Sequence, residues 1–345
     1  MLVVIVVSLC LLGVPLVTKF LVPLVHSTNS VEHQATTTSQ SFPHQLFSKV
    51  LSERSGQSLV MSPCAVQAAL GSLGKWGEGA TRDQLISLGG NSSKSCGGNT
   101  SILLLVPEQG LRKEVQGKVI QRLDYRMKEA GVQIVEWLKR HTQKEQESGW
   151  VVKGLDNSQV VGLVVSSIQL SLGKEVVGQF QGQETAMVKV QGGVRRGRLE
   201  HSSVTVLEGE GGMSLCLVVP LTTGDELPGG EECWDPRVTS SQDSVTLPKL
   251  QLSSQLTLAP ALLALGLRVV GEEAELGPLS TQNGLRLGQL YQMAQFSIQP
   301  SDQEGKQGLP EGENIVIDRP FTFLVGQKSL NRTIFIGTYI GSTPH

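Results

Sequence analysis

The residues that could perform acid–base, nucleophilic or metal chemistry are few and scattered in this 345-residue chain. Its six histidines show no carboxylate or cysteine at a spacing typical of a catalytic or metal site. The sequence contains no G-x-S-x-G elbow, H-E-x-x-H zinc motif, Walker loop or dinucleotide fingerprint. A triad can assemble from distant residues, but no motif in this sequence nominates one. We expect no enzyme, no cofactor and no metal.

The five cysteines are the next candidates for chemistry. Their wide spacing, without a C-x-x-C pair, does not suggest zinc binding or thioredoxin-like redox chemistry. Cys96 and Cys233 lie in polar loops and are candidates for disulfide formation. Cys216 lies in the apolar run 215–220 and is expected to be a buried thiol. The sequence does not say which cysteines pair.

The N-terminal sequence points to a secreted, extracellular protein. Residues 1–17 are almost wholly apolar, but the run is short for a bilayer span and Pro15 interrupts it. We predict a signal peptide over residues 1–27, with a signal anchor as the alternative, and a flexible polar segment over 28–41. Three N-glycosylation sequons support secretion. Their acceptor residues are Asn91, Asn99 and Asn331.

The charge balance excludes some partners. A net charge of -2 with 17% charged residues gives no reason to expect nucleic-acid binding. Beyond the signal peptide no segment is long and apolar enough to span a membrane. We expect a monomer.

One basic pattern suggests a polyanion. Residues 111–138 have helical periodicity, and Lys118, Arg122 and Arg126 recur every four residues beside the apolar face. On a helix these side chains form a ridge that could bind heparin or another glycosaminoglycan weakly. The alternative is an ordinary solvated helix face, because acidic residues lie between the basic ones.

The elements that must position these residues form an α+β pattern. Near the C-terminus the apolar runs 315–325 and 334–340 flank a polar turn, which predicts a hairpin. The run 160–172 is apolar on both faces, which is typical of a strand covered on both sides. Apolar residues at helical spacing begin at Phe42, and Ser62-Pro63 is a typical helix start.

Three blocks of sequence carry a family resemblance. In chain order they are SP at 62–63 with TRDQL at 81–85, LPKL at 247–250, and DRPFTF at 318–323 followed by IFIG at 334–337. Together they resemble the serpins, the serine-protease-inhibitor family. The resemblance implies one α+β domain over residues 42–343, in which large mixed or antiparallel β-sheets pack with several helices.

The resemblance places the bait loop of an inhibitory serpin at residues 296–314. After cleavage such a loop inserts into the central sheet, which favours small residues because alternate side chains become buried. The loop here is short and contains charges and prolines, and burying an unpaired charge costs several kcal/mol. Its notable residues are Pro300, Asp302, Glu304, Gly305, Lys306, Gly308 and Pro310.

We therefore expect a non-inhibitory serpin of the hormone-precursor or carrier type. NGLRLGQL at 283–290 and the Cys96 loop resemble the angiotensinogen branch, although the peptide that defines that branch is not in the sequence. The expected partner is an extracellular protein or a small hydrophobic ligand. The alternative is an extracellular serine-endopeptidase inhibitor with an atypical loop and Lys306 as its bait residue, with a protease as partner. A third hypothesis is that the chain is a decaying serpin copy without a function.

Overall fold

The computed structural model describes residues 41–54, 56–89, 96–106, 120–124, 130–142, 159–222, 227–272, 275–279, 285–301, 312–327 and 332–341. The chain divides into two compact units, Met1–Ser39 and Gln40–His345, and every described residue belongs to the second. The predicted signal peptide at 1–27 and nearly all of the segment 28–41 lie outside the described residues. No helix in the described ranges is long and apolar enough to cross a membrane.

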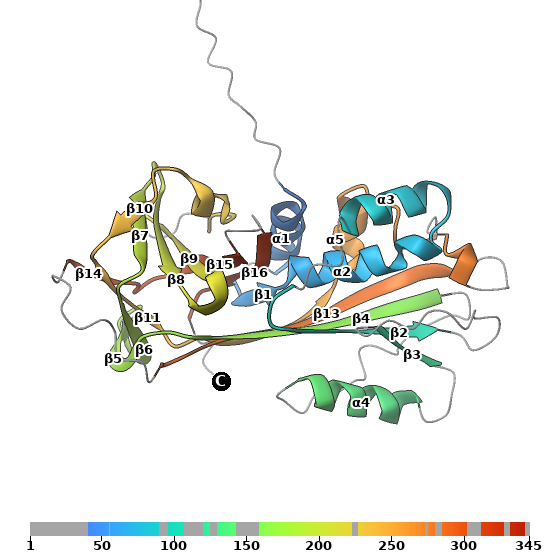
Figure 1. Cartoon of the computed structure of the whole chain (residues 1–345), viewed down its shortest axis with the longest axis horizontal. Helices are drawn as coiled ribbons and strands as arrows, with labels where there is room; N and C mark the ends of the chain where they lie inside the picture. The colour runs from blue at the N-terminus through green and yellow to red at the C-terminus, as the bar shows by residue number, and fades with distance from the viewer. Residues whose placement is uncertain are drawn as a thin grey trace, which may run out of the picture. The chain divides into compact units, whose positions relative to one another are not determined.

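A five-stranded sheet, here called the central sheet, lies in the middle of this unit (Figure 1). Its two inner strands, β13 and β4, run parallel from Arg286 opposite Gln159 to Gln299 opposite Ser171. Both strands are buried along most of their length, as the apolar run 160–172 predicted. In spatial order the strands are β12 (Gln251–Thr257), β13 (Arg286–Gln299), β4 (Gln159–Ser171), β2 (Asn99–Val106) and β3 (Ile120–Asp124).

A seven-stranded sheet contains the C-terminal hairpin. The hairpin is formed by β15 and β16, as predicted, but its first strand begins at Phe321, and residues 315–316 of the predicted run belong to a strand of another sheet. Pro320 directly precedes β15, so its missing N–H costs the ladder nothing. In spatial order the strands are β1 (Leu59–Met61), β16 (Arg332–Tyr339), β15 (Phe321–Gln327), β9 (Met213–Pro220), β8 (Ser202–Glu208), β7 (Val194–Arg198) and β10 (Thr239–Ser241).

A four-stranded sheet completes the β structure at one end of the central sheet. Its strands are β14 (Asn314–Val316), β11 (Ser244–Pro248), β6 (Gln183–Gln191) and β5 (Lys174–Phe180). β14 and β11 are parallel, whereas the other pairs are antiparallel.

The helices cover both faces of the central sheet. The helices α1, α2, α3 and α5 lie on one side and α4 lies on the other (Figure 1). The start of α2 is as predicted, because the Ser62 hydroxyl accepts the Ala65 N–H at 3.2 Å and Pro63 occupies the first turn. The helices are α1 (Phe42–Glu53), α2 (Pro63–Leu73), α3 (Gly79–Gly89), α4 (Ala130–His141) and α5 (Ala259–Ala264), with short 3-10 turns η1 (Gly74–Trp76), η3 (Glu210–Gly212), η4 (Glu231–Trp234) and η5 (Gly277–Leu279).

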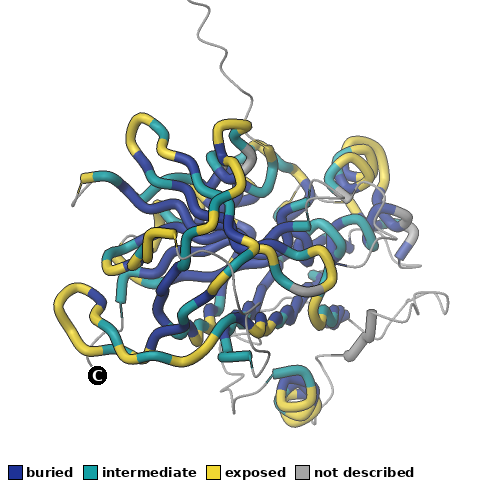
Figure 2. Tube along the Cα trace, turned by 60° about the vertical axis from the view of Figure 1, so that its left-hand side comes forward, coloured by how far each residue is buried: buried dark blue, intermediate teal, exposed yellow. Residues whose placement is uncertain are grey.

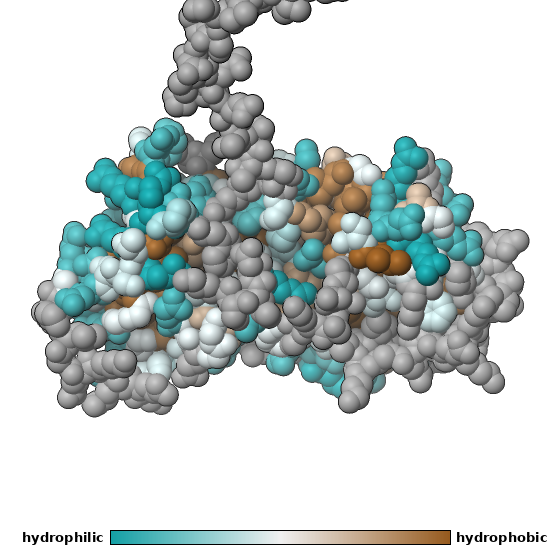
Figure 3. Space-filling model, turned by 45° about the horizontal axis from the view of Figure 1, so that its top comes forward, coloured by the Kyte–Doolittle hydropathy of each residue, from teal (hydrophilic) through white to brown (hydrophobic). Residues whose placement is uncertain are grey.

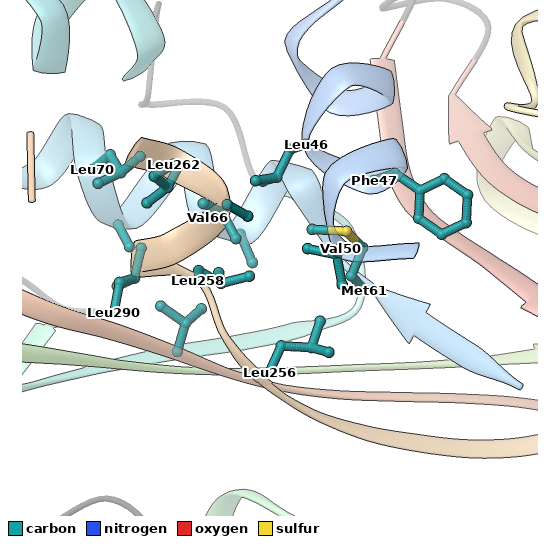
Figure 4. Packing of buried hydrophobic residues seen from close by; sticks show 14 of the residues in the cluster. Leu46, Phe47, Val50, Met61, Val66, Leu70, Leu256, Leu258, Leu262 and Leu290 are labelled. Atoms are coloured by element: carbon teal, nitrogen blue, oxygen red, sulfur yellow. The ribbon is translucent and has the colours of Figure 1, made fainter. Parts of the chain in front are cut away.

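The main core lies between the central sheet and the helices α1, α2 and α5. Figure 4 shows residues of these elements packed together, with Leu46 from α1, Val66 from α2 and Leu290 from β13 among them. Each is fully buried, which contributes about 1.5–3 kcal/mol per large apolar side chain. On the opposite face of the sheet α4 buries Ile134, Trp137 and Leu138. Figure 2 shows α4 with its buried side toward the strands and its exposed side away from them.

The helix-covered side of the molecule shows apolar side chains among polar ones (Figure 3). Ile86 of α3 and Leu263 of α5 are large apolar residues with exposed fractions of 51% and 50%. Scattered apolar residues of this kind are normal on folded proteins.

The long helix predicted over 111–138 is wrong in its middle part. Residues Ile120–Asp124 form β3, which pairs in parallel with β2, and the helix α4 begins only at Ala130. The apolar residues in this stretch fit a helical repeat, but a short strand can show the same spacing. Pairing with β2 supplies backbone hydrogen bonds that a helix would otherwise provide.

Candidate functional site: the central sheet and the loop that follows β13

The loop that the sequence resemblance singled out, residues 296–314, includes the end of β13 and leaves the central sheet there. Gln299 accepts the Leu172 N–H at 2.9 Å, and the Ser301 N–H donates to the Gly173 carbonyl at 2.8 Å. Pro300 lies between these bonds, at a position where its missing N–H has no ladder partner to lose. Gly173 has φ +52° and no room for a side chain, because a Cβ would meet the Lys189 carbonyl. The departure point of the loop is therefore fixed by backbone hydrogen bonds.

The other end of the loop is held by hydrogen bonds and an ion pair before β14. The Glu313 N–H donates to Asp243 Oδ1 at 2.9 Å, and Arg196 Nη1 lies 2.9 Å from Glu313 Oε2 and 3.5 Å from Asp243 Oδ2. The Ser241 hydroxyl, followed by the Glu313 N–H and Arg196, holds the pKa of Asp243 below its usual value. Asp243 therefore stays ionised beside Arg196 at neutral pH.

The structure describes the two ends of the loop and only one of its predicted functional residues. Pro300 is described and half-buried. The predicted residues Asp302, Glu304, Gly305, Lys306, Gly308 and Pro310 lie outside the described residues.

In the middle of β13, buried hydrogen bonds join Gln292 to Ser62 at the start of α2. Gln292 of β13 accepts the Ser62 N–H at 3.1 Å and donates to the Ser62 carbonyl at 2.8 Å. The Ser62 hydroxyl donates to the Ile334 carbonyl of β16 at 2.8 Å. Gln292 and Ser62 are fully buried. This network ties a central strand, the start of α2 and the C-terminal hairpin together.

Sequence reasoning missed Gln292. β13 contains four glutamines, Gln289, Gln292, Gln295 and Gln299, and the sequence does not distinguish the fully buried Gln292 from the others. A buried amide needs partners for its donor and its acceptor, and these become visible only when Ser62 is placed beside Gln292.

The four cysteines described in the structure form two disulfides, Cys64–Cys96 and Cys216–Cys233. Cys96 and Cys233 are oxidised, each with a partner that the sequence did not identify. The buried thiol predicted at Cys216 is wrong, because η4 places Cys233 against β9. Cys64 lies in the first turn of α2, so the first bridge fastens this helix to the chain entering β2.

The remaining predicted site residues do not form one site. Asn99 is exposed at the first position of β2, whereas Asn91 and Asn331 lie outside the described residues. Arg122 lies in β3, so the prediction of a helical ridge through Lys118, Arg122 and Arg126 is wrong.

Lys118 and Arg126 themselves lie outside the described residues. Within the ranges that the structure describes, no group of three or more histidine, cysteine, aspartate or glutamate residues could hold a metal ion.

The described part of the chain thus combines a central sheet in which β4 pairs directly with β13, a C-terminal hairpin inside a second sheet, and a loop whose two ends are held by hydrogen bonds. Residues 181–341 match the family model of the serpins, described as serine protease inhibitors. The match covers the C-terminal part of the chain, and the resemblance to serpins seen in the sequence is confirmed.

Solved structures show the same fold over nearly their whole length. They include uncleaved ovalbumin (TM-score 0.70, 16% identity, 88% of this chain and 98% of that chain) and native protease nexin-1 with heparin (TM-score 0.70, 16% identity, 87% and 97%). A highly specific serpin of the insect Tenebrio molitor matches with a TM-score of 0.70 and 17% identity over 89% and 100% of the two chains. No curated protein matches the sequence. At these identities the likeness shows the fold, and the predicted α+β fold class is confirmed.

Proposed function

We propose that this chain is a secreted serpin-fold protein that acts as a carrier or precursor and does not trap proteases by loop insertion. The observation that carries the proposal is the length of the loop. β13 ends at Gln299 and β14 begins at Asn314, so residues 300–313 must leave the sheet, expose a cleavage site and return. This connection has only as many residues as β13 itself, which has 14.

The length limits what a cleaved loop could insert. β13 is about 46 Å long at roughly 3.3 Å per residue. A cut after Lys306 would leave residues 300–306, and about two of them would be needed for the reversal of chain direction. The remaining residues could extend over only about 16 Å, which is roughly a third of β13. The charges of Asp302, Glu304 and Lys306 would add a burial cost wherever they entered a covered part of the sheet.

Secretion is supported by two independent features. The apolar N-terminus has the character of a signal peptide. The two disulfides are typical of proteins that fold in an oxidising compartment. The proposed partner is another extracellular protein or a small hydrophobic ligand, and we propose no catalytic activity.

Limited proteolysis followed by thermal unfolding tests the proposal. The full chain is cut between residues 302 and 311, the cut is located by mass spectrometry, and the unfolding midpoint is compared with that of uncut protein. We expect a change of less than about 2 °C, because a short unpaired segment contributes little to stability. A large rise of the midpoint would mean that the cleaved loop inserts.

That result would overturn the proposal and favour the inhibitor alternative, with Lys306 as the bait residue. The Lys306→Ala variant provides the matched control. Incubation with trypsin-like proteases should give no covalent, detergent-resistant complex with either protein. A complex formed by the unmodified chain and lost in the variant would establish the inhibitor.

A further inference from the structure

The outer face of the central sheet, meaning the face toward α4, changes character along the strands. Under α4 the outer-face residues are apolar and buried, such as Val165 of β4 and Met293 of β13. Further toward the C-terminal ends of the same strands, the outer-face residues become uncharged and polar. Ser167 follows Val165 on this face, and Gln295 follows Met293.

These polar residues line a pocket of about 440 Å³. Two rows of paired residues cross the sheet there, one from Asn99 through Ser167 and Gln295 to Ser253 and the other from Gln169 through Ser297 to Gln251. Ile168 and Phe296 also line the pocket but point to the core, with exposed fractions of 5% and 1%. The half-buried side chains of Met213 and Leu252 line it too, so the accessible surface of the pocket combines the polar rows with apolar groups.

The chemistry of this lining selects a neutral ligand rich in hydrogen-bonding groups. The lining contains hydroxyl and amide groups but no charged side chain. Amides offer both donors and acceptors, and hydroxyls do the same. An ionic ligand would find no counterion here, and an apolar ligand would remove water from amides without replacing its hydrogen bonds. Carbohydrate fits both requirements, because it is uncharged and carries hydroxyl and acetamido groups.

One residue of the lining begins an N-glycosylation sequon. Asn99 begins the sequon Asn99-Thr100-Ser101 and is exposed. Its side chain shares the outer face with Leu103 and Leu105, which contact the α4 side of the sheet. A sugar on Asn99 would therefore start at one edge of the pocket, with the polar rows extending away from it across three further strands, a span of about 14 Å.

We propose that Asn99 carries an N-linked glycan whose first N-acetylglucosamine residues lie in this pocket against Gln169, Gln251 and Gln295. The inference rests on the proposed secretion, since N-glycosylation occurs in the secretory pathway. The line along which β4 and β13 pair is here called the β4–β13 seam. On the outer face, the glycan would cover the polar end of this seam, next to the part that α4 covers.

The test uses the full chain expressed in cultured mammalian cells. Mass spectrometry of glycopeptides from the secreted protein measures the occupancy of Asn99. The rate at which an amidase releases the Asn99 glycan is then measured on the native protein, the denatured protein and two variants. The first variant, Gln169→Ala with Gln295→Ala, removes amides of the pocket. The control, Gln179→Ala with Gln183→Ala, removes exposed amides from the β5–β6 hairpin.

We expect Asn99 to be occupied and its glycan to be released at least tenfold more slowly from native than from denatured protein. The pocket variant should release it at least threefold faster than the native parent, and the control variant should not. The milder Gln251→Ser variant serves if the double variant fails to fold, and it should also accelerate release.

Three results would overturn the inference. Occupancy at Asn91 or Asn331 without occupancy at Asn99 would refute it while leaving secretion intact. Equal release rates in the parent and the pocket variants would show that the glycan does not contact the pocket. Retention of the chain in the cell without any glycan would refute the proposed secretion, and this inference with it.

Discussion

Replacing Gln292 by leucine tests whether the buried link between β13 and α2 stabilises the closed central sheet. Leucine has a similar volume, so the variant removes the amide chemistry with little change in packing. The Ser62 N–H loses its partner at 3.1 Å and, being fully buried, has no water to replace it. The Ser62 carbonyl keeps a bond from the Val66 N–H at 3.2 Å. The loss is therefore dominated by one orphaned donor.

An unsatisfied buried donor costs about 1–3 kcal/mol. We expect the free energy of unfolding to fall by this amount, which corresponds to a decrease in the unfolding midpoint of roughly 2–6 °C for a domain of this size. Denaturant titration should show a lower midpoint with an unchanged m-value, because the surface exposed on unfolding stays the same. Circular dichroism during a thermal and a urea titration measures both quantities.

The matched control is Gln299→Leu, at the half-buried end of the same strand. It should change the free energy of unfolding by less than about 0.5 kcal/mol, as surface substitutions usually do. If the two variants were equally stable, the Gln292–Ser62 bonds would contribute nothing beyond those of an ordinary surface amide. The reasoning from buried hydrogen bonds would then be refuted.

Three further perturbations probe the disulfide, the N-terminal helix and the loop anchor. Replacing Cys216 and Cys233 by alanine removes a disulfide with a sequence separation of 17. We expect the free energy of unfolding to fall by about 3 kcal/mol. A thermal midpoint equal to that of the parent would contradict this expectation. Burial lowers the pKa of His44 below 6.5, although Glu232 and the Gly230 carbonyl oppose the shift. The unfolded chain therefore binds this proton first, so stability is complete above pH 6.5 and falls as pH drops from there toward the lowered pKa. The decrease should be smaller in His44→Gln, and identical slopes in parallel urea titrations would exclude this role. Arg196→Ala removes a partly exposed ion pair to Glu313. The free energy of unfolding should change by less than about 1 kcal/mol, while proteolysis of the adjoining loop becomes faster. An unchanged cleavage rate would show that the pair does not hold the loop end.

Local sequence signals predicted the parts of the fold that depend on neighbouring residues. Ser62 and Pro63 start α2 because a hydroxyl cap and a proline act within one helical turn. The C-terminal hairpin and the apolar run of β4 also followed from patterns contained in a few residues. These features could be predicted because their physical causes lie within the segment itself.

Features that depend on distant segments could not be obtained in this way. The cysteine pairs are set by η4 lying against β9 and by the chain entering β2 near α2, neither of which leaves a local mark. The stretch 120–124 forms a strand because β2 offers it an edge to pair with. The role of Gln292 appears only when Ser62, 230 residues away, is placed beside it.

The closed seam between β4 and β13 bears directly on the proposed function. From the core side Gln292 binds Ser62, and from the outer side α4 packs Ile134, Trp137 and Leu138 over both strands. Parting the strands along their whole length would break their mutual backbone bonds and disturb both supports. A fully inserted strand would pair with β4 on one edge and with β13 on the other, and would thereby replace the lost backbone hydrogen bonds. Such a replacement of bonds can be favourable.

The loop of this chain is too short to complete that exchange. About five inserted residues would pair only with the last third of β13, and each net backbone bond contributes about 0.5–1.5 kcal/mol. They would end before reaching the part of the seam that α4 covers, where the apolar outer-face residues Val161 and Leu163 lie. Opening that covered part would then cost hydrogen bonds and apolar contacts that no inserted residue restores. The favourable course after cleavage is for the seam to stay closed, and this is why we expect the unfolding midpoint of the cut protein to remain that of the uncut one.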